Sequence, residues 1–146
     1  MEPVARGLVQ QFPAIPAWRS GLAILHADLG RENEAREEFD LLAEDDFAAF
    51  PRDGNWPISM ALLAEVCAFL GDSERAAQLY EHLRPWERLC ITVGIATVCY
   101  GATSRLIGRL AATMDRWGDA ERHFEDALER NTKMGALAWT AWTQQD

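Results

Sequence analysis

Apolar positions recur along this chain in three similar stretches, each made of an apolar run, a tight break and a second run. In each second run, an aromatic residue follows an alanine by four positions, and a small or apolar residue follows three positions later. These residues are Ala35, Phe39 and Leu42; Ala76, Tyr80 and Leu83; and Ala120, Phe124 and Ala127. Spacings of three and four place the members of each set on one helical face. The pattern predicts helical hairpins that cover each other's apolar faces, and therefore an all-α stack.

The breaks predict where the helices begin and end. Gly30 and Gly71 stand at the first two breaks, and Asp115 stands at the third. Helices are expected over 17–29, 32–43, 58–70, 73–83, 102–114, 117–130 and 133–144. Asp72 or Ser73 can cap the helix after Gly71, because a short side-chain oxygen accepts hydrogen bonds from the first free N–H groups.

Two segments interrupt the helical pattern. Residues 47–57 hold two prolines and an Asp-Gly turn signal, so we expect a loop whose aromatic residues pack back on the hairpins. Within residues 86–100, the stretch 89–93 is rich in β-branched residues, but a strand without a partner is unstable. We expect an extended or partly helical linker over 86–100. A closed globular bundle, or a sheet built around Ile91 and Val93, would contradict the whole account of stacked helical hairpins.

Length and composition limit the classes of protein to which this chain can belong. A chain of 146 residues suits a single domain over 1–146, and the helical pattern that continues to its last residue favours a fragment of a longer chain. No apolar run reaches the roughly 18 residues of a membrane span. The absence of a secretory leader and the three irregularly spaced cysteines favour a cytoplasmic location. A net charge of -9 disfavours nucleic acid, because phosphate binding needs clustered Lys and Arg.

The sequence lacks the common motifs of phosphate binding, hydrolysis, zinc binding and thiol redox chemistry. It holds no phosphate-binding Gly-Lys-Ser/Thr loop, Gly-x-Ser-x-Gly, His-Glu-x-x-His or CxxC motif. We therefore expect no enzymatic activity, no cofactor and no metal. His82 and His123 are expected at the surface, and His26 is expected to be packed inside the first helix pair.

Burial is the expected state of most tryptophans and of two of the cysteines. Most of the six tryptophans are expected in the core, because each buries a large area. Trp139 and Trp142 could instead be exposed at the end of the chain, which would favour a homodimer or an end-to-end stack. Cys90 and Cys99 are interpreted as small buried hydrophobic residues.

A candidate groove follows from the geometry of stacked hairpins, in which the first helices line a concave surface. The residues expected there are Asp28, Glu65, Phe69, Arg105 and Arg109. They give an acidic wall, an aromatic patch at Phe69 and a basic wall of two arginines four residues apart. The arginines could clamp a carboxylate of a peptide or of a neighbouring domain. Alternatively, they pair with Glu65 or solvent and bind nothing.

The alanine, aromatic and small-residue positions resemble those of tetratricopeptide repeats, and residues 115–128 carry the pattern most fully. The breaks lie farther apart than the standard ~34-residue period, with the surplus in the two irregular segments. Residues 12–18, 51–56 and 99–105 are similar to the helical-repeat region behind the ATPase module of bacterial LuxR-type transcriptional regulators and class III adenylate or guanylate cyclases.

This resemblance implies a right-handed α-α superhelix of about three hairpins plus flanking helices. It also implies a non-catalytic protein-interaction or sensory scaffold module that serves signal transduction or transcription regulation. Its expected partner is a protein, a peptide or a neighbouring domain. A small-ligand-binding or enzymatic helical domain, with a site formed in the groove, stays open as the alternative.

Overall fold

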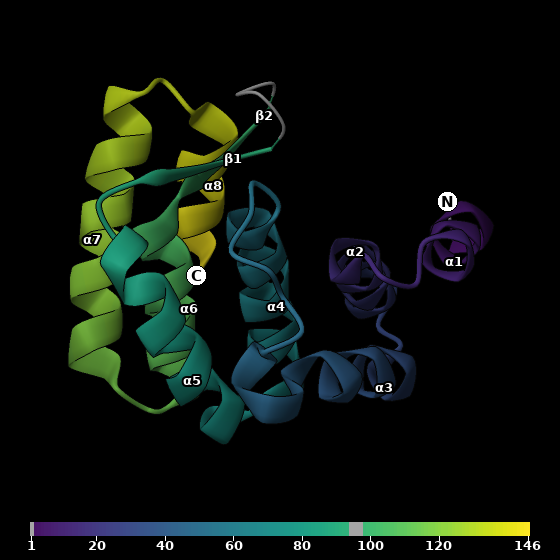
Figure 1. Ribbon diagram of the computed structural model, residues 1–146. Helices are drawn as coiled ribbons and strands as arrows, with labels where there is room; N and C mark the ends of the chain where they lie inside the picture. The colour runs from purple at the N-terminus through teal and green to yellow at the C-terminus, as the bar shows by residue number, and fades with distance from the viewer. Residues whose placement is uncertain (1, 94–97) are drawn as a thin grey trace.

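The computed structural model describes residues 2–93 and 98–146, and about 74% of the chain is helical. The helices are α1 (Glu2–Gln11), α2 (Pro16–Asp28), α3 (Glu32–Ala43), α4 (Trp56–Leu70), α5 (Ser73–Leu83), α6 (Thr103–Thr113), α7 (Trp117–Lys133) and α8 (Leu137–Gln145). Short 3-10 turns cover Glu44–Phe47 and Arg84–Trp86, and two strands, β1 (Cys90–Val93) and β2 (Val98–Ala102), precede α6 (Figure 1). The expected mostly helical class is confirmed at this level.

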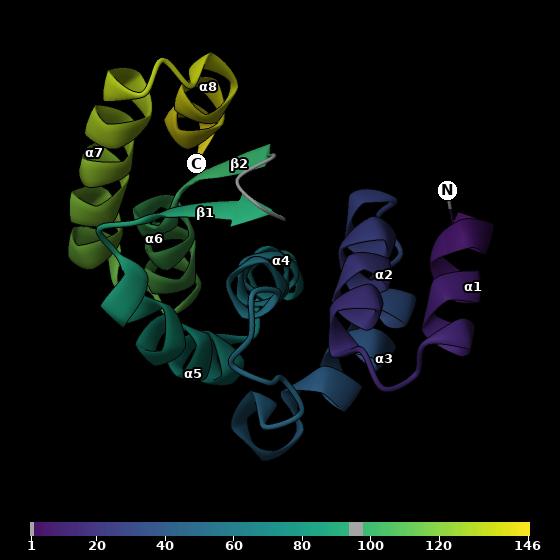
Figure 2. The ribbon, with the colours of Figure 1, turned by 45° about the horizontal axis from the view of Figure 1, so that its top comes forward.

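Three consecutive helix pairs form the body of the molecule. The pairs are α2 with α3, α4 with α5, and α6 with α7, and the members of each pair are in contact. Figure 2 shows α4 between α2 and α6, and α4 contacts both of them. Helix α1 packs on α2 at one end, and α8 packs on α7 at the other. The three pairs are those that the sequence pattern predicts.

The breaks between paired helices have the backbone that the sequence requires. Gly30 and Gly71 have φ of 69° and 65°, a left-handed conformation that glycine adopts without steric cost. Asp115, at the third break, has φ of 59°. The Asp72 side chain accepts a hydrogen bond from the Arg75 N–H at 3.1 Å, so the predicted cap of α5 is confirmed.

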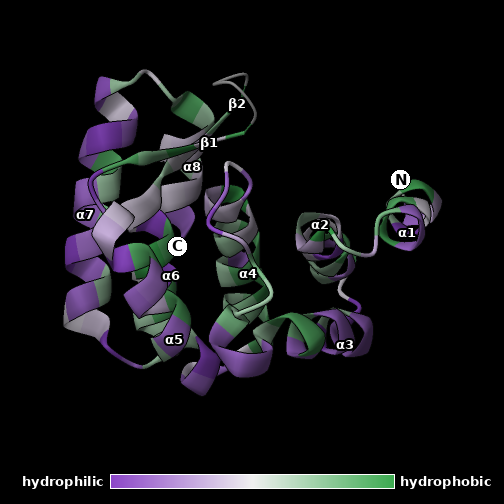
Figure 3. Ribbon diagram, viewed as in Figure 1, coloured by the Kyte–Doolittle hydropathy of each residue, from purple (hydrophilic) through white to green (hydrophobic). Residues whose placement is uncertain are grey.

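The core is centred on α4, which is apolar around most of its circumference (Figure 3). Its Met60, Leu63 and Val66 are fully buried. Residues of the neighbouring helices complete the same cluster: Phe39, Leu79, Leu106, Ile107 and Leu110. The irregular segment before α4 adds Phe47 and Phe50, and Trp56 at the start of α4 joins them, so the expectation that the aromatic residues of 47–57 pack back on the hairpins is confirmed.

The linker expected over residues 86–100 is wrong for its described part. β1 and β2 form an antiparallel pair in which Cys90 lies opposite Ala102 and Thr92 lies opposite Cys99. The β-branched run therefore has a strand partner, and a two-stranded sheet exists around Ile91 and Val93. Because α6 still contacts α4 and α5, this hairpin is an insertion that leaves the helix pairs in place. Residues 94–97 of the expected linker lie outside the described residues.

Some helix bounds also differ from expectation. Helix α1 was not expected, and none of its residues is buried. α7 continues to Lys133, and α8 begins only at Leu137, because Gly135 adopts φ of 68° and ends the helical path. α4 begins at Trp56, with Pro57 in its first turn, where the missing N–H costs nothing.

Burial corrects several side-chain expectations. Among the six tryptophans only Trp56 is buried, whereas Trp117 is 64% exposed, so the placement of most tryptophans in the core is wrong. Trp142 is 49% exposed, as the pattern allowed. Cys99 is exposed and Cys90 is half-buried, because both belong to the inserted hairpin rather than to the helical core.

The histidines divide differently from the prediction. His26 is buried, as expected. His123 is only 2% exposed, so its predicted surface position is wrong: its ring faces α5, where Tyr80 lies. His82 is half-buried between Asp46 and Arg52, its Nε2 3.0 Å from Asp46 Oδ1. Among the described residues, no helix has both the length and the apolar character to cross a membrane.

Candidate functional site

A charged trough lies where α2, α4, α6 and the end of α8 face one another. Its hollow measures about 300 Å³. The residues that line it are Ile24, Asp28, Glu65, Tyr100, Arg105, Arg109, Trp142, Gln145 and Asp146. The trough draws on residues from across the sequence, and the packing of α4 against α2 and α6 brings them together.

Four of the five residues expected in the groove line this trough: Asp28, Glu65, Arg105 and Arg109. Phe69 is not among the residues that line this hollow, so the aromatic patch expected at that position stays a prediction. Phe69 lies one helical turn beyond Glu65 on α4 and is 41% exposed. The trough has an aromatic contribution, but it comes from Tyr100 and Trp142.

Glu65 joins the two arginines. The Nη1 of Arg105 donates to Glu65 Oε1 at 2.6 Å, and the Nη1 of Arg109 donates to Glu65 Oε2. The Arg105 and Glu65 side chains are 7% and 11% exposed, so this ion pair is largely removed from water. The pairing of the arginines with Glu65, one of the two sequence-based alternatives, is therefore present.

A second carboxylate contacts the same arginines. Asp146 Oδ2 lies 2.6 Å from the Nε of Arg105, and Asp146 Oδ1 lies 3.7 Å from the Nε of Arg109. Each arginine therefore contacts both Glu65 and Asp146, and the formal charges of the two arginines and two carboxylates balance.

Aromatic side chains surround Arg105. Its guanidinium carbon is 5.9 Å from the ring centres of both Trp139 and Trp142, within the range of a cation–π contact. Trp139 packs against Tyr100 with 4.8 Å between ring centres and 48° between the ring planes. Burial raises the pKa of the Tyr100 hydroxyl, which keeps this group neutral at the edge of the trough.

A close backbone approach fixes Trp139. A Cβ at Gly101 would lie 2.9 Å from the Trp139 ring, so only glycine fits there. The Trp139 Nε1–H donates to the Cys99 carbonyl at 3.0 Å. The inserted β-hairpin therefore anchors the first half of α8, and so decides where Asp146 lies.

Sequence reasoning missed Tyr100, Trp142, Gln145 and Asp146 as trough residues. One signal could have found two of them: Trp142 and Asp146 are four residues apart, so they share a face of α8. Tyr100 gave no comparable signal, because its strand was interpreted as part of a linker.

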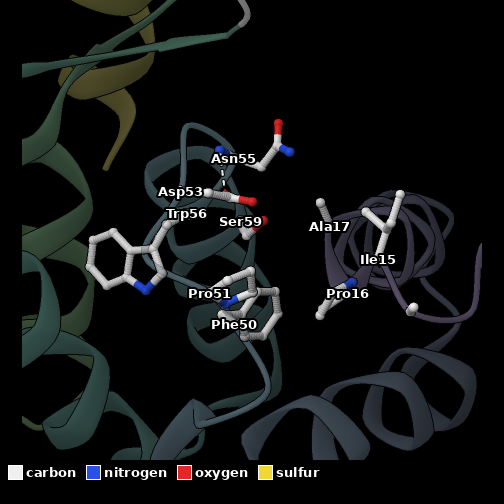
Figure 4. A pocket seen from close by; sticks show the side chains of 10 residues that line it. Ile15, Pro16, Ala17, Phe50, Pro51, Asp53, Asn55, Trp56 and Ser59 are labelled. Carbon is white, nitrogen blue, oxygen red and sulfur yellow. Dashed lines mark hydrogen bonds between the residues drawn. The ribbon is translucent and has the colours of Figure 1, made fainter.

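Two other hollows flank α2. An apolar hollow of about 490 Å³ between α1 and α2 is lined by Val4, Leu8, Trp18 and Ile24 among others, and it shares Ile24 and Asp28 with the charged trough. Figure 4 shows a smaller hollow, about 120 Å³, in which Ile15, Pro16 and Ala17 face the segment from Phe50 to Ser59.

Chemically, the trough is suited to ionic and aromatic recognition: it presents two arginines, acidic side chains and two aromatic rings. Within residues 2–93 and 98–146, no group of three or more His, Cys, Asp or Glu side chains is placed to hold a metal ion. Fold and site together define a mostly helical protein with an open, charged trough. Comparison with protein-family models, with curated proteins and with solved structures gives no match.

Proposed function

We propose that this chain is a non-catalytic protein-interaction module whose charged trough binds a carboxylate-bearing segment of a partner. In this proposal the helix pairs form a right-handed superhelix of tetratricopeptide type, with α2, α4 and α6 on its concave side. The module would serve as a sensory or scaffolding part of a bacterial signalling or transcription-regulatory protein, as the sequence resemblance implies.

One observation carries the proposal: a carboxylate already lies against both arginines. The Asp146 carboxylate lies 2.6 Å from Arg105 Nε and 3.7 Å from Arg109 Nε, while Glu65 contacts the Nη1 atoms of the same arginines. A guanidinium group presents several N–H donors in a plane that matches a carboxylate. The trough therefore already holds a carboxylate of its own chain, which Asp146 supplies at the end of α8.

The openness of the trough favours a peptide over a small molecule. Trp142 is 49% exposed, the Arg109 side chain is 27% exposed, and Asp28 is exposed. Small-molecule sites usually enclose most of the ligand surface, and this trough does not. An extended or helical segment that runs along α2 can also use the adjoining apolar hollow.

The charge of the chain restricts the partner. At a net charge of -9, the protein repels a strongly acidic molecule at long range. The partner segment is therefore one that carries a local carboxylate among apolar residues, rather than an acidic tail. Salt would then weaken its binding only modestly.

A displayed random-peptide library, selected on the full chain, tests the proposal. Peptides enriched in Asp or Glu beside apolar residues are expected. Each selected peptide is then measured on Arg109→Ala, which removes a partly exposed arginine, and on Arg105→Ala/Arg109→Ala. Loss of an arginine that pairs with the peptide carboxylate should weaken peptide binding by about tenfold or more.

The matched control is Arg122→Ala on the exposed face of α7, where the Arg122 side chain is 65% exposed. This variant should bind the selected peptides as the unmodified chain does. Circular dichroism and thermal melting check that each variant is folded, since the double variant leaves Glu65 with neither arginine. Selected peptides that bind folded Arg109→Ala with unchanged affinity would contradict the proposal.

A further inference from the structure

The two halves of α8 are held in different ways. Thr143, the one buried residue of the helix, donates to the Trp139 carbonyl at 2.7 Å and accepts from Asn131 at 3.3 Å. Trp139 is fixed against the β-hairpin. Beyond Thr143, Gln144 and Gln145 are exposed, whereas the Asp146 side chain is 15% exposed and makes the ion pairs of this turn with the two arginines.

The contact that Asp146 makes is close but poorly aligned. Its Oδ2 lies 2.6 Å from Arg105 Nε, yet this buried N–H has no hydrogen-bond acceptor in suitable geometry among the described residues. A buried donor without an aligned acceptor loses much of the free energy of its hydration. Arg105 is 6% exposed, so a better-placed carboxylate would gain this hydrogen bond without having to bury the guanidinium.

The last turn of α8 is attached by a backbone hydrogen bond from the Asp146 N–H to the Trp142 carbonyl, 3.2 Å long, and by the edge-on contact of Trp142 with Trp139, with 4.7 Å between ring centres. Trp142 is half exposed where it stands. Departure of this turn leaves the Trp139 and Thr143 anchors intact, but leaves the two arginines with only Glu65 to balance them.

We infer that the last turn of α8 is an internal ligand of the trough, and that the partner is a helical segment with an aromatic residue four positions before a carboxylate, as in Trp142 and Asp146. The inference deepens the proposed function and rests on it. The partner's carboxylate replaces that of Asp146 at Arg105 and Arg109, and its aromatic ring takes the place of Trp142. Apolar residues that continue the same helical face contact the hollow beside Trp18 and Ile24.

The test uses the full chain and a fluorescent peptide with the sequence of residues 137–146, labelled at its N-terminus and amidated at its C-terminus. The amide ensures that only the Asp side chain supplies a carboxylate. Fluorescence anisotropy gives its affinity for the unmodified chain, for Asp146→Ala, and for Glu129→Ala as a control that removes an exposed carboxylate on α7.

Because Asp146 competes with the probe, Asp146→Ala should bind it about tenfold more tightly than the unmodified chain does, and Glu129→Ala should not differ from the unmodified chain. A probe with Asn in place of its Asp should lose most of this affinity for Asp146→Ala. Equal affinity of the unmodified chain and Asp146→Ala, equal affinity of the Asp and Asn probes, or no binding to any of the chains would overturn the inference. Library peptides that still depend on Arg109 would show that the proposed function survives such a failure.

Discussion

His123 shows how a single residue can be polar and still belong to the interior. Its Nε2 lies 2.9 Å from the Tyr80 hydroxyl, and its Nδ1 lies 2.9 Å from Glu87 Oε1. The Tyr80 O–H donates to Nε2 when the proton of the neutral ring is on Nδ1, beside the Glu87 carboxylate. The contact joins the second helices of two neighbouring pairs, α5 and α7.

Burial lowers the pKa of His123 below its ordinary value of 6.5, and the positive charge of Arg122 acts in the same direction. Glu87 and Asp119 oppose this shift. The unfolded chain therefore binds a proton at this residue more readily than the folded chain does. Folding stability from this group is complete above pH 6.5 and is lost as the pH falls below that value.

The pH dependence tests this arrangement. Between pH 7.5 and pH 5, the free energy of unfolding of the unmodified chain should fall more than that of His123→Gln, measured by urea denaturation at each pH. His82→Gln is the matched control, because His82 is half-buried beside Asp46 and leaves His123 in place. If His123→Gln and the unmodified chain lose the same stability over this range, His123 is not protonated less readily in the folded protein.

At the residue scale, the sequence predicted which side chains lie in the trough better than it predicted which side chains they contact. Helical spacing placed Arg105, Arg109, Glu65 and Asp28 on the facing sides of first helices, and the trough contains all four. The same spacing could not show how far along a helix the hollow extends, and Phe69 is not among its lining residues. Asp146 was missed because its role depends on the path of α8, which no local pattern determines.

At the scale of elements, the small residue in the first helix of the third pair decides how closely that pair packs. Gly108 of α6 lies against Phe124 of α7, and a Cβ at Gly108 would be 2.7 Å from the Phe124 ring. The aromatic residue of the repeated pattern therefore packs directly on the backbone of its partner helix. Gly118, near the start of α7, has no atom within 4 Å of such a Cβ.

Alanine at these two glycines should have opposite effects. Gly108→Ala forces the Phe124 ring or the helix to move and should cost about 1–3 kcal/mol of stability. Gly118→Ala meets open space and should gain about 0.5 kcal/mol, because alanine loses less backbone entropy in a helix. Urea denaturation of both variants measures the difference, and a stabilised Gly108→Ala would show that α6 and α7 do not pack this closely.

The elements that the sequence missed are those with weak or misleading local signals. Helix α1 has apolar residues at helical spacing, Val4 and Leu8, but it buries no residue and lies outside the repeated pattern on which the prediction depended. β1 was identified as strand-like, but β2 contains Gly101 and no regular alternation, so the pairing could not be predicted. The helix pairs were predicted because each has an apolar face at helical spacing and a break that favours left-handed backbone.

At the scale of the whole molecule, one apolar cluster connects all three helix pairs. It runs from Ala23 in α2, through Leu63 and other residues of α4, to Ala120 in α7. Each pair covers the apolar face of the next, so removing contacts in the middle weakens both neighbours. That residues 1–146 fold as a single domain stays a prediction, which the unfolding of the chain can test.

Truncation of a leucine at the centre of the cluster tests that prediction. Leu63 is fully buried in α4, and Leu63→Ala should cost about 2–5 kcal/mol through lost apolar burial and the cavity it leaves. Leu41→Ala is the control: Leu41 is 53% exposed on α3, and its loss should change stability by less than about 0.5 kcal/mol. Far-ultraviolet circular dichroism follows the helices, and tryptophan fluorescence follows the whole stack, from Trp18 through the buried Trp56 to Trp142. If the cluster is one cooperative unit, both probes of Leu63→Ala shift to the same lower denaturant midpoint. Two separate transitions would mean that α4 divides the chain into units that fold independently, because the ends would then lose structure at different denaturant concentrations.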